Sequence, residues 1–582
     1  MELSYVHDSY FLFTTSDKFY IEPRNKDGSS TNSECLTIDR ISREIQIESN
    51  RNIAADAISR TIYGIIGVIR LIAGNYLLVI TARVKIGEIR EHTIWQITGT
   101  DVIPYVRTTL HLNETQVQDN KSYLAMVHSV LQTESYYYST TYDLTHSFQR
   151  LQNTSPEFRH MPLHERAEER FVWNFHVLRE FALRSDLAKY TLPIMHGFVG
   201  VRSCVINGHP FRLVLISRRS CYRAGVRFHT RGVDSQGHVA NFVETEQIVE
   251  YGTFKCSFVQ TRGSIPLYWS QTPNLRWQPW PTIYPDGQLN GFVSHIESQI
   301  FNYGKQVIVN LVNRKGREQQ VGETLGVVAE DSGVRDIKYV HYDFHKEVKA
   351  LNFDRVNNLI DQLLPDLETF GYFMARDDGY AHKLQTGVFR TNCIDCLDRT
   401  NVVQSLLAKR SLESQLNYLQ VLAARDSLSN HPGFEFTFKN LWADNGDLCS
   451  IQYAGTGALK VDFTRTGKRT KWGVLRDVIN ASVRYYKNNF LDGFRQDAID
   501  LFLGNYIVDE ENITSPMRRD WDWRFAAVPL GFVLALSMFV LCLTFETELF
   551  FTLFWLVCAM ALLAFIFAYG EEFVNRPKLK VD

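Results

Sequence analysis

The pattern of apolar positions divides the chain into a long mixed part and two uninterrupted apolar runs near its C-terminal end. In the first 180 or so residues, β-like runs such as residues 76–80, which continue towards Ile89, are separated by polar turns such as residues 25–32. Short apolar strands then alternate with helical patterns. This order predicts a mostly-β N-terminal part over residues 1–180, followed by an α/β domain over residues 181–507.

The second part carries the clearer signals. Residues 211–216 and 306–312 are short, apolar and β-branched, as expected of strands that are buried on both faces. Helical spacing is shown by Val356, Leu359, Ile360, Leu363 and Leu364. The alternation predicts a largely buried sheet.

Two uncharged runs, residues 525–545 and 549–569, are each close to the roughly 20 residues that cross a bilayer as a helix. Only Glu546, Thr547 and Glu548 separate them, so we expect a helical hairpin. The alternative is a buried hairpin of a soluble domain, which the length of the uncharged runs disfavours.

The flanks of the hairpin predict its orientation. They are basic: Arg518, Arg519 and Arg524 precede it, and Arg576, Lys578 and Lys580 follow it. By the positive-inside rule both ends face the cytosol, with residues 508–524 as a polar tether and residues 570–582 as a cytosolic tail. Lys578 and Lys580 resemble a dilysine retrieval signal of endoplasmic-reticulum membrane proteins, and a plain basic flank is the alternative.

Composition narrows the function classes. The formal net charge of −2 gives no support for general nucleic-acid binding. Nine scattered cysteines argue against a disulfide framework, and the first residues do not resemble a secretory signal. We therefore expect the bulk of the chain in the reducing cytosol.

The candidate catalytic residues are concentrated in residues 390–401, Arg-Thr-Asn-Cys-Ile-Asp-Cys-Leu-Asp-Arg-Thr-Asn. A strand-like piece, residues 387–389, precedes it, and a helical pattern that includes Val402 and Leu406 follows. A loop between a strand and a helix start suits an anion, because backbone N–H groups and the helix dipole point into it. Cys393 and Arg399 form a Cys-x5-Arg pair across this loop.

This pair predicts phosphate chemistry. The backbone N–H groups and the helix dipole that favour an anion also lower the pKa of Cys393. Its thiolate attacks phosphorus and forms a phosphocysteine. Arg399 grips two phosphate oxygens. Asp395 and Asp398 are candidates for the acid that protonates the leaving alcohol; Asp395 is favoured, but spacing does not choose between them. Thr400 is placed to hydrogen-bond the sulfur, and no metal is needed by this route.

Other interpretations of the loop stay open. Cys393 and Cys396 have the spacing of half a zinc site, although no second pair of matching spacing is found. They also have the spacing of a redox pair, which the neighbouring carboxylates disfavour, and a purely structural loop is the third alternative. A reversible Cys393–Cys396 disulfide is a further hypothesis.

Residues 390–401 resemble the signature of the Sac-domain (suppressor-of-actin) phosphoinositide phosphatases, a match far longer than Cys-x5-Arg. Residues 241–247, 260–266 and 342–345 resemble the same family, and the likeness covers roughly residues 1–505. The C-terminal hairpin makes the integral-membrane member of the endoplasmic reticulum and Golgi the nearest match.

The resemblance implies a mostly-β Sac subdomain, an α/β catalytic domain resembling the cysteine phosphatases and a transmembrane hairpin. It implies phosphatidylinositol 4-phosphate as the main substrate, with the 3-phosphate and some bisphosphates as lesser ones. Cys393 is then the nucleophile and Arg399 the phosphate clamp. The other predicted substrate-binding residues are Asn392, Ile394, Cys396, Leu397, Asp398 and Thr400. The implied location is the endoplasmic reticulum membrane with cycling to the Golgi, with retrieval-coat binding through Lys578 and Lys580.

A lipid substrate calls for basic side chains on the membrane-facing side. Two clusters are candidates: Arg218, Arg219, Arg223, Arg227 and Arg231, and Lys460, Arg465, Lys468, Arg469 and Lys471 in a predicted loop. Solvated faces are the alternative for both. Whether the site acts on its own membrane or an apposed one depends on the geometry of the tether.

Two other functions compete with the lipid phosphatase. A membrane-bound protein-tyrosine phosphatase usually takes its acid from a Trp-Pro-Asp loop, whereas Trp280-Pro281 is followed here by Thr282. A non-catalytic lipid-binding scaffold is disfavoured by the intact Cys393 and Arg399.

Overall fold

Two β-sheets organise the chain in the computed structural model, which describes residues 5–25, 34–49, 57–348, 354–424, 426–459, 461–466, 470–508, 517, 523–545 and 548–579. The smaller sheet is antiparallel and has the order β4-β3-β2-β1-β5. Its strands are β1 (Tyr10–Thr14), β2 (Lys18–Pro23), β3 (Cys35–Asp39), β4 (Ile45–Glu48) and β5 (Ile58–Ile62). The predicted polar turn at residues 25–32 lies outside the described residues, except for Asn25.

The larger sheet has the order β17-β16-β20-β13-β12-β11-β10-β9-β8-β7-β6, with β18 and β19 beside β13. Its first part comprises β6 (Ile65–Leu71), β7 (Gly74–Ile89), β8 (His92–Pro104), β9 (Tyr136–Tyr138), β10 (Met195–Ile206) and β11 (His209–Arg219). Its second part comprises β12 (Val243–Tyr251), β13 (Phe254–Arg262), β16 (Lys305–Asn310), β17 (Ile337–His341), β18 (Phe373–Arg376), β19 (Ala381–Lys383) and β20 (Gly387–Asn392). The strands predicted at residues 76–80, 211–216 and 306–312 are confirmed as β7, β11 and β16.

The direction in which neighbouring strands pair changes along the large sheet. From β6 to β13 the neighbouring strands are antiparallel, whereas β13, β20, β16 and β17 are parallel. Parallel strands need crossover connections, and helices supply them here. The carboxyl ends of parallel strands are the usual place for ligand sites in open α/β sheets.

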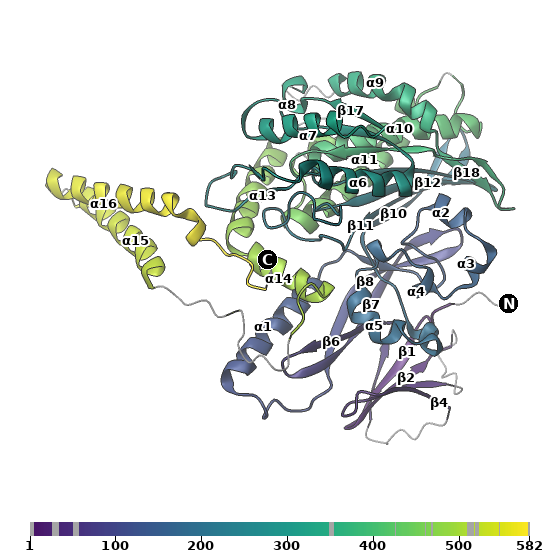
Figure 1. Ribbon diagram of the computed structural model, residues 1–582, viewed down its shortest axis with the longest axis horizontal. Helices are drawn as coiled ribbons and strands as arrows, with labels where there is room; N and C mark the ends of the chain where they lie inside the picture. The colour runs from purple at the N-terminus through teal and green to yellow at the C-terminus, as the bar shows by residue number, and fades with distance from the viewer. Residues whose placement is uncertain are drawn as a thin grey trace.

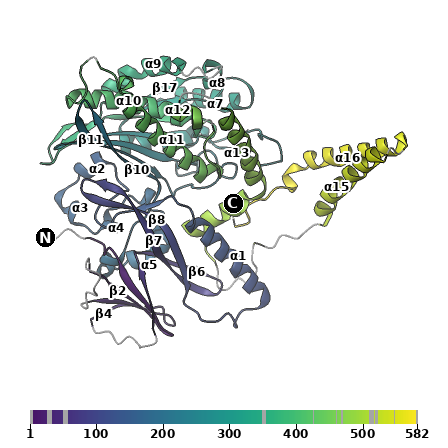
Figure 2. The same cartoon turned by 180° about the vertical axis from the view of Figure 1, so that it is seen from behind.

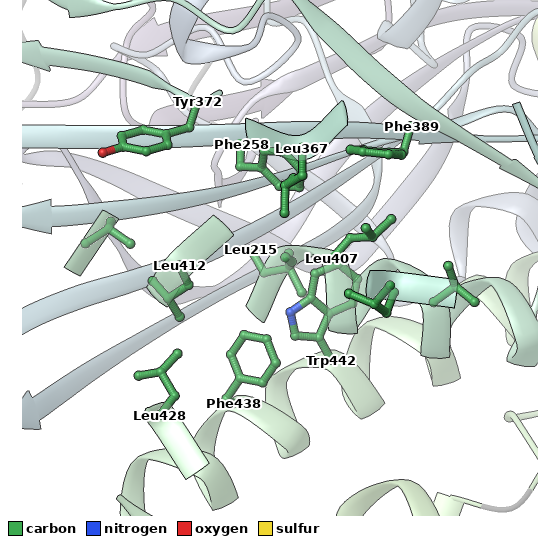
Figure 3. Packing of buried hydrophobic residues seen from close by; sticks show 14 of the residues in the cluster. Leu215, Phe258, Leu367, Tyr372, Phe389, Leu407, Leu412, Leu428, Phe438 and Trp442 are labelled. Carbon is green, nitrogen blue, oxygen red and sulfur yellow. The ribbon is translucent and has the colours of Figure 1, made fainter. Parts of the chain in front are cut away.

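Helices cover both faces of the parallel end. On one face α6 (Gln288–Tyr303) and α7 (Gln319–Asp331) bury Phe292, Ile296 and Leu325 against Ile308 of β16. On the other face lie α9 (Asp354–Phe370), α10 (Asp398–Tyr418) and α11 (Pro432–Ala454). Figure 3 shows Phe438 and Trp442 of α11 beside Leu407 and Leu412 of α10. The predicted α/β domain with a buried sheet is confirmed.

The two predicted subdomains share the large sheet. Strand β9 pairs with β10, so backbone hydrogen bonds continue across residue 180. The N-terminal half is also covered by α1 (Glu114–Leu131), α5 (Phe175–Ala182) and α14 (Asp492–Leu503), and α14 comes from the far end of the α/β half. The division at residue 180 therefore remains a prediction.

The remaining helices and short strands lie between these elements in the chain. They are α2 (Phe148–Gln152), α3 (Pro156–His160), α4 (Leu163–Arg166), β14 (Trp269–Ser270), β15 (Thr282–Ile283), α8 (Phe344–Glu347), α12 (Val461–Thr466) and α13 (Lys471–Phe490). Helix α12 corrects the expectation of a loop over residues 460–471, which rested on the glycine and threonine content of that stretch.

Two apolar helices, α15 (Trp523–Thr544) and α16 (Leu549–Ala568), pack side by side and project away from the rest of the chain (Figures 1 and 2). Both are long and apolar enough to cross a membrane. Apolar side chains such as Leu530, Val533 and Phe550 are exposed, so the hairpin is not the core of a soluble domain. Glu546, Thr547 and most of the tether lie outside the described residues.

The segment after α16 returns to the main body of the chain and docks on α14. The backbone N–H groups of Lys578 and Leu579 donate to the Asp497 carboxylate at 2.9 to 3.0 Å, and Leu579 is buried. Asn575 N–H donates to Asn489 O at 2.7 Å, and the Asn575 side chain accepts from Phe494 N–H at 2.9 Å. The chain is therefore attached to the body again after the second apolar helix, through residues 575–579.

Replacing Asp497 by alanine is expected to release this docked segment. The substitution leaves the N–H groups of Lys578 and Leu579 without their acceptor, at a cost of about 1–3 kcal/mol, or roughly 5- to 150-fold in local opening. Hydrogen exchange of residues 573–579 in the full chain measures the effect. The exposed Asp361 on α9 supplies the control D361A, and equal exchange in both variants would contradict the docking.

Candidate active site

The catalytic loop predicted from the sequence lies between a buried strand and a long helix. All residues of β20 are buried, and α10 begins at Asp398, so the predicted strand and helix are both confirmed. Arg390 fixes the strand, because its guanidinium group donates to the carbonyl oxygens of Gly263 and Ser264 at 3.0 and 2.8 Å. The loop thus leaves the sheet at the carboxyl end of a parallel strand.

The two cysteines of the loop face each other. Cys393 N–H donates to Cys396 Sγ at 3.2 Å, and Cys396 N–H donates to Cys393 Sγ at 3.2 Å. Cys396 has a φ of 54°, in the left-handed region that non-glycine residues rarely adopt. Its thiol donates to Gly263 O at 2.8 Å, which holds this conformation in place. Strain of this kind concentrates at functional sites.

The environment favours a thiolate at Cys393. The hydrogen bond from Cys396, together with the positive charge of Arg399, outweighs burial and lowers the pKa of the Cys393 thiol to about 7. Burial raises the pKa of Cys396 well above its ordinary value, so this thiol stays protonated, and its single S–H can be directed to Gly263 O or to the Cys393 sulfur. Cys393 therefore has the lowered pKa that suits a nucleophile, whereas Cys396 does not, and the catalytic role of Cys393 stays a prediction.

The alkylation rate of Cys393 is expected to rise with pH through a midpoint near 7, because only the thiolate reacts. Below the midpoint the thiol is protonated and the rate falls. Iodoacetamide labelling of the full chain, followed by mass spectrometry of the Cys393 peptide, measures the midpoint. Cys221 is the internal reference, since burial raises its pKa to about 12. A Cys393 midpoint above 8.5, the ordinary cysteine value, would contradict this assignment.

Arg399 is held by a carboxylate that sequence reasoning missed. Its Nη1 and Nη2 atoms donate to the two carboxylate oxygens of Glu318 at 2.8 and 2.7 Å, and Nη1 also donates to Leu311 O at 3.0 Å. Glu318 lies just before α7, and no local motif marks it. The pair fixes the guanidinium plane beside the loop.

Asp395 is held by two arginines. Arg227 donates to its carboxylate at 2.6 and 3.0 Å, and Arg231 donates at 2.7 Å. Burial alone would raise the pKa of Asp395, but the two guanidinium groups hold it well below its usual range. In this arrangement Asp395 is ionised, so its predicted role as the acid requires the arginines to leave it. That role stays a prediction.

Comparison with known proteins identifies the family. The SacI homology domain family matches residues 63–349. The chain is 50% identical over 579 residues to the phosphatidylinositol-3-phosphatase SAC1-B of Danio rerio, with 98% of each chain covered. It is 43% identical over 588 residues to the phosphatidylinositol-3-phosphatase SAC1 of Drosophila melanogaster, covering 99% of this chain and 97% of that one. This chain belongs to the Sac-domain family. A more distant relative is the phosphatidylinositol-3-phosphatase SAC1 of Saccharomyces cerevisiae, 35% identical over 541 residues, or 89% and 85% of the two chains.

Four of the other predicted residues of the Sac-domain loop have structural partners. Asn392 Nδ2 donates to Asn310 Oδ1 at 3.1 Å, and Ile394 O accepts from Arg231 Nη1 at 2.8 Å. The Leu397 side chain is buried with Tyr453 and Ala454, and Asp398 accepts from Leu459 N–H at 3.3 Å.

Thr400 is buried, and its Oγ1 atom has no hydrogen-bond partner within the described part of the chain. A buried hydroxyl without a partner is costly, and it suits the predicted hydrogen bond to a reacting sulfur or phosphate. Its role in substrate binding stays a prediction.

The first basic cluster divides in two. Arg218 and Arg219 are buried inside the Sac domain, so the expectation that they face a membrane is wrong for both. Arg218 pairs with Glu244 and Glu246 instead, and Arg219 donates to backbone carbonyl oxygens. Arg227 and Arg231 do reach the catalytic loop, as described above.

The second cluster is only partly described. Lys460, Lys468 and Arg469 lie outside the described residues. Arg465 donates to Asn440 and pairs with Asp444, whereas Lys471 is exposed at the start of α13.

Proposed function

We propose that this chain is a membrane-anchored phosphoinositide phosphatase that forms a phosphocysteine at Cys393. The observation that carries the proposal is a thiol of lowered pKa, beside Arg399, in a strand-to-helix loop of a Sac-domain protein. The relatives are named as phosphatases of phosphoinositides, in agreement with the chemistry of this loop. The preferred substrate is phosphatidylinositol 4-phosphate, and the 3-phosphate lipid, named for several relatives, is a lesser one.

The reaction has two steps. The Cys393 thiolate attacks phosphorus, an S–P bond forms, and the bond from phosphorus to the inositol oxygen breaks. The leaving oxygen takes a proton from an acid of the loop. The same group, now deprotonated, takes a proton from water, whose oxygen bonds to phosphorus. The S–P bond breaks, so inorganic phosphate leaves and the thiolate of Cys393 is restored.

The arginines link substrate binding to the acid. A lipid phosphate offers Arg227 and Arg231 an anion that competes with the carboxylate of Asp395. Release of Asp395 from this double ion pair raises its pKa and allows it to carry a proton. Asp398 remains the alternative acid. Arg399, oriented by Glu318, stabilises the charge of the transferring group.

The hairpin anchors the catalytic body to its substrate. We place α15 and α16 across a membrane of the endoplasmic reticulum, with cycling to the Golgi and with both ends of the chain in the cytosol. The retrieval-coat role of Lys578 and Lys580 remains a proposal. In the docked segment Lys578 Nζ donates to Met517 O at 2.9 Å, so coat binding would require release of this lysine.

The test is phosphate release by the full chain in detergent–lipid micelles from each phosphoinositide and from a phosphotyrosine peptide, with EDTA present. Fastest release from the 4-phosphate lipid in EDTA supports the metal-independent route and the substrate. Release from the peptide alone would favour a protein phosphatase, and no release from any substrate would overturn the enzyme assignment.

A further inference from the structure

Helix α13 presents its apolar residues outward and its polar residues inward. Its buried residues are Arg484, Asn488 and Asn489. Its outward stripe, which we call the α13 stripe, consists of Trp472, Leu475, Ile479, Val483, Tyr486 and Phe490, all of them exposed. Their spacing of three and four residues places them along one side of the helix. A helix that borders water turns its apolar stripe inward, so this face suits an apolar environment.

The charges around the α13 stripe indicate which apolar environment it fits. Helix α13 carries four basic residues and one acidic residue. Lys471 and Arg476 are exposed at its N-terminal half, and Arg276 is exposed on the neighbouring loop. Apolar and basic residues on one helix are the composition of helices that lie in the surface of an anionic bilayer.

The neighbouring loop adds aromatic side chains. Trp277 stacks on Tyr485 of α13, with ring centroids 5.5 Å apart and planes at 14°. Trp277 and Trp280 are both more than half exposed. Tryptophan gathers at the level of lipid headgroups, where an apolar ring with a polar edge is favoured.

The segment that follows the membrane hairpin also packs beside the end of α13. Helix α16 ends at Ala568, and Gly570 packs against the backbone of Asn274 so closely that a Cβ atom would overlap it. A few residues later, Asn575 N–H donates to Asn489 O at the end of α13. Figures 1 and 2 both show α13 on the side of the body from which the hairpin leaves. The bilayer surface therefore meets the body next to α13.

We propose that the α13 stripe lies in the surface of the same bilayer that holds the hairpin and sets the catalytic loop at the level of the lipid headgroups. The proposal rests on the proposed function, which supplies the membrane and its lipid substrate. The inner face of α13 reaches the site directly, since Asn488 Oδ1 accepts from Arg227 Nη1 at 3.3 Å. A helix is about 10–12 Å across, and the headgroup layer on each side of the hydrocarbon core is roughly 5–8 Å thick. The docked body thus acts on lipids of its own membrane.

The first test compares membrane-embedded and soluble substrates. The double variant L475E/I479E places two charges in the α13 stripe, and V327E places one on the exposed side of α7 as a control. Each full-length chain is reconstituted in liposomes and assayed with long-chain 4-phosphate lipid and with a water-soluble short-chain analogue. The ratio of the two rates is expected to fall about ten-fold or more in the double variant and to stay at the wild-type value in V327E. An unchanged ratio in the double variant would overturn the proposal.

The second test does not depend on activity. A nitroxide label is placed at I479C or V327C in full-length chains that carry C221S, C393S and C558S, in nanodiscs with anionic lipid. Relaxation by oxygen is expected to dominate at position 479, and relaxation by an aqueous nickel chelate at position 327. Equal nickel access at both positions would overturn the proposal. Protection of position 479 from both agents would also overturn it, because a second copy or another protein would then cover the stripe.

The two proposals fail separately. If the wild-type chain releases phosphate from neither substrate while the label at position 479 reports lipid, the phosphatase assignment fails and the membrane contact stands. If the wild-type chain releases phosphate and the label reports water, the membrane contact fails and the phosphatase assignment stands.

Discussion

Replacing Cys393 by serine is expected to lower phosphate release at least roughly a thousand-fold, because the phosphocysteine can no longer form. A serine hydroxyl in this loop stays protonated near neutral pH, whereas the lowered pKa of Cys393 makes the thiolate available. The substitution also removes the sulfur that accepts the N–H of Cys396. The measurement is phosphate release from the 4-phosphate lipid by the full-length variant.

The matched control is C221S, which makes the same replacement of sulfur by oxygen at a cysteine that is far from the loop in sequence and has a raised pKa. It is expected to keep the wild-type rate. Labelling with a radioactive phosphate donor lipid adds a direct readout, since the wild-type chain should trap label at position 393 on acid quench. Activity of C393S within ten-fold of the wild-type rate would show that another group is the nucleophile.

The second large effect is on stability, and it follows from Arg218. This side chain is fully buried and pairs with Glu244 at 2.8 Å and with Glu246 at 2.7 Å. Replacing it by methionine leaves two carboxylates in the interior without their partner. Breaking a buried ion pair on one side costs about 3–5 kcal/mol, so R218M is expected to lower the free energy of unfolding by that amount.

Denaturant unfolding of the full chain in nanodiscs, followed by tryptophan fluorescence, measures this change. The control is R202M on β10, where Arg202 pairs with Asp444 at the surface and the expected change is below about 1 kcal/mol. Adding E244Q and E246Q to R218M removes the stranded charges and should recover part of the loss. Equal stability of R218M and R202M would contradict the buried pair.

Local patterns predicted the elements that carry the site, and long-range pairing decided its electrostatics. The strand before Cys393 and the helix after it follow from neighbouring residues, because burial and helical spacing are visible within a short window. Glu318 meets Arg399 across 81 residues, and Arg227 meets Asp395 across 168. No local signal connects such residues, so neither the orienting carboxylate nor the ionised state of Asp395 was predictable.

The arginine-rich stretch shows the same limit. A run of arginines suggested a surface, but Arg218 lies directly opposite Glu244 in the register of β11 and β12. Both strands are buried over most of their length, so the charges are paired inside the sheet. The stripe on α13 was missed because an apolar helical pattern normally predicts a core-facing helix. Its outward direction follows only from the polar partners of Arg484 and Asn488.

The docking of the C-terminal end sets an order of events during synthesis. Phe502 of α14 and Leu579 belong to the same buried cluster as Tyr76, Val127 and Trp173 from the N-terminal half. A ribosome releases the N-terminal half first, yet this cluster stays open until α14 emerges, and it is sealed by Leu579 only after the hairpin has been made. Nascent chains halted before α14 should therefore recruit chaperones through the uncovered face of α1. The buried cluster is therefore completed only after both apolar helices have been synthesised.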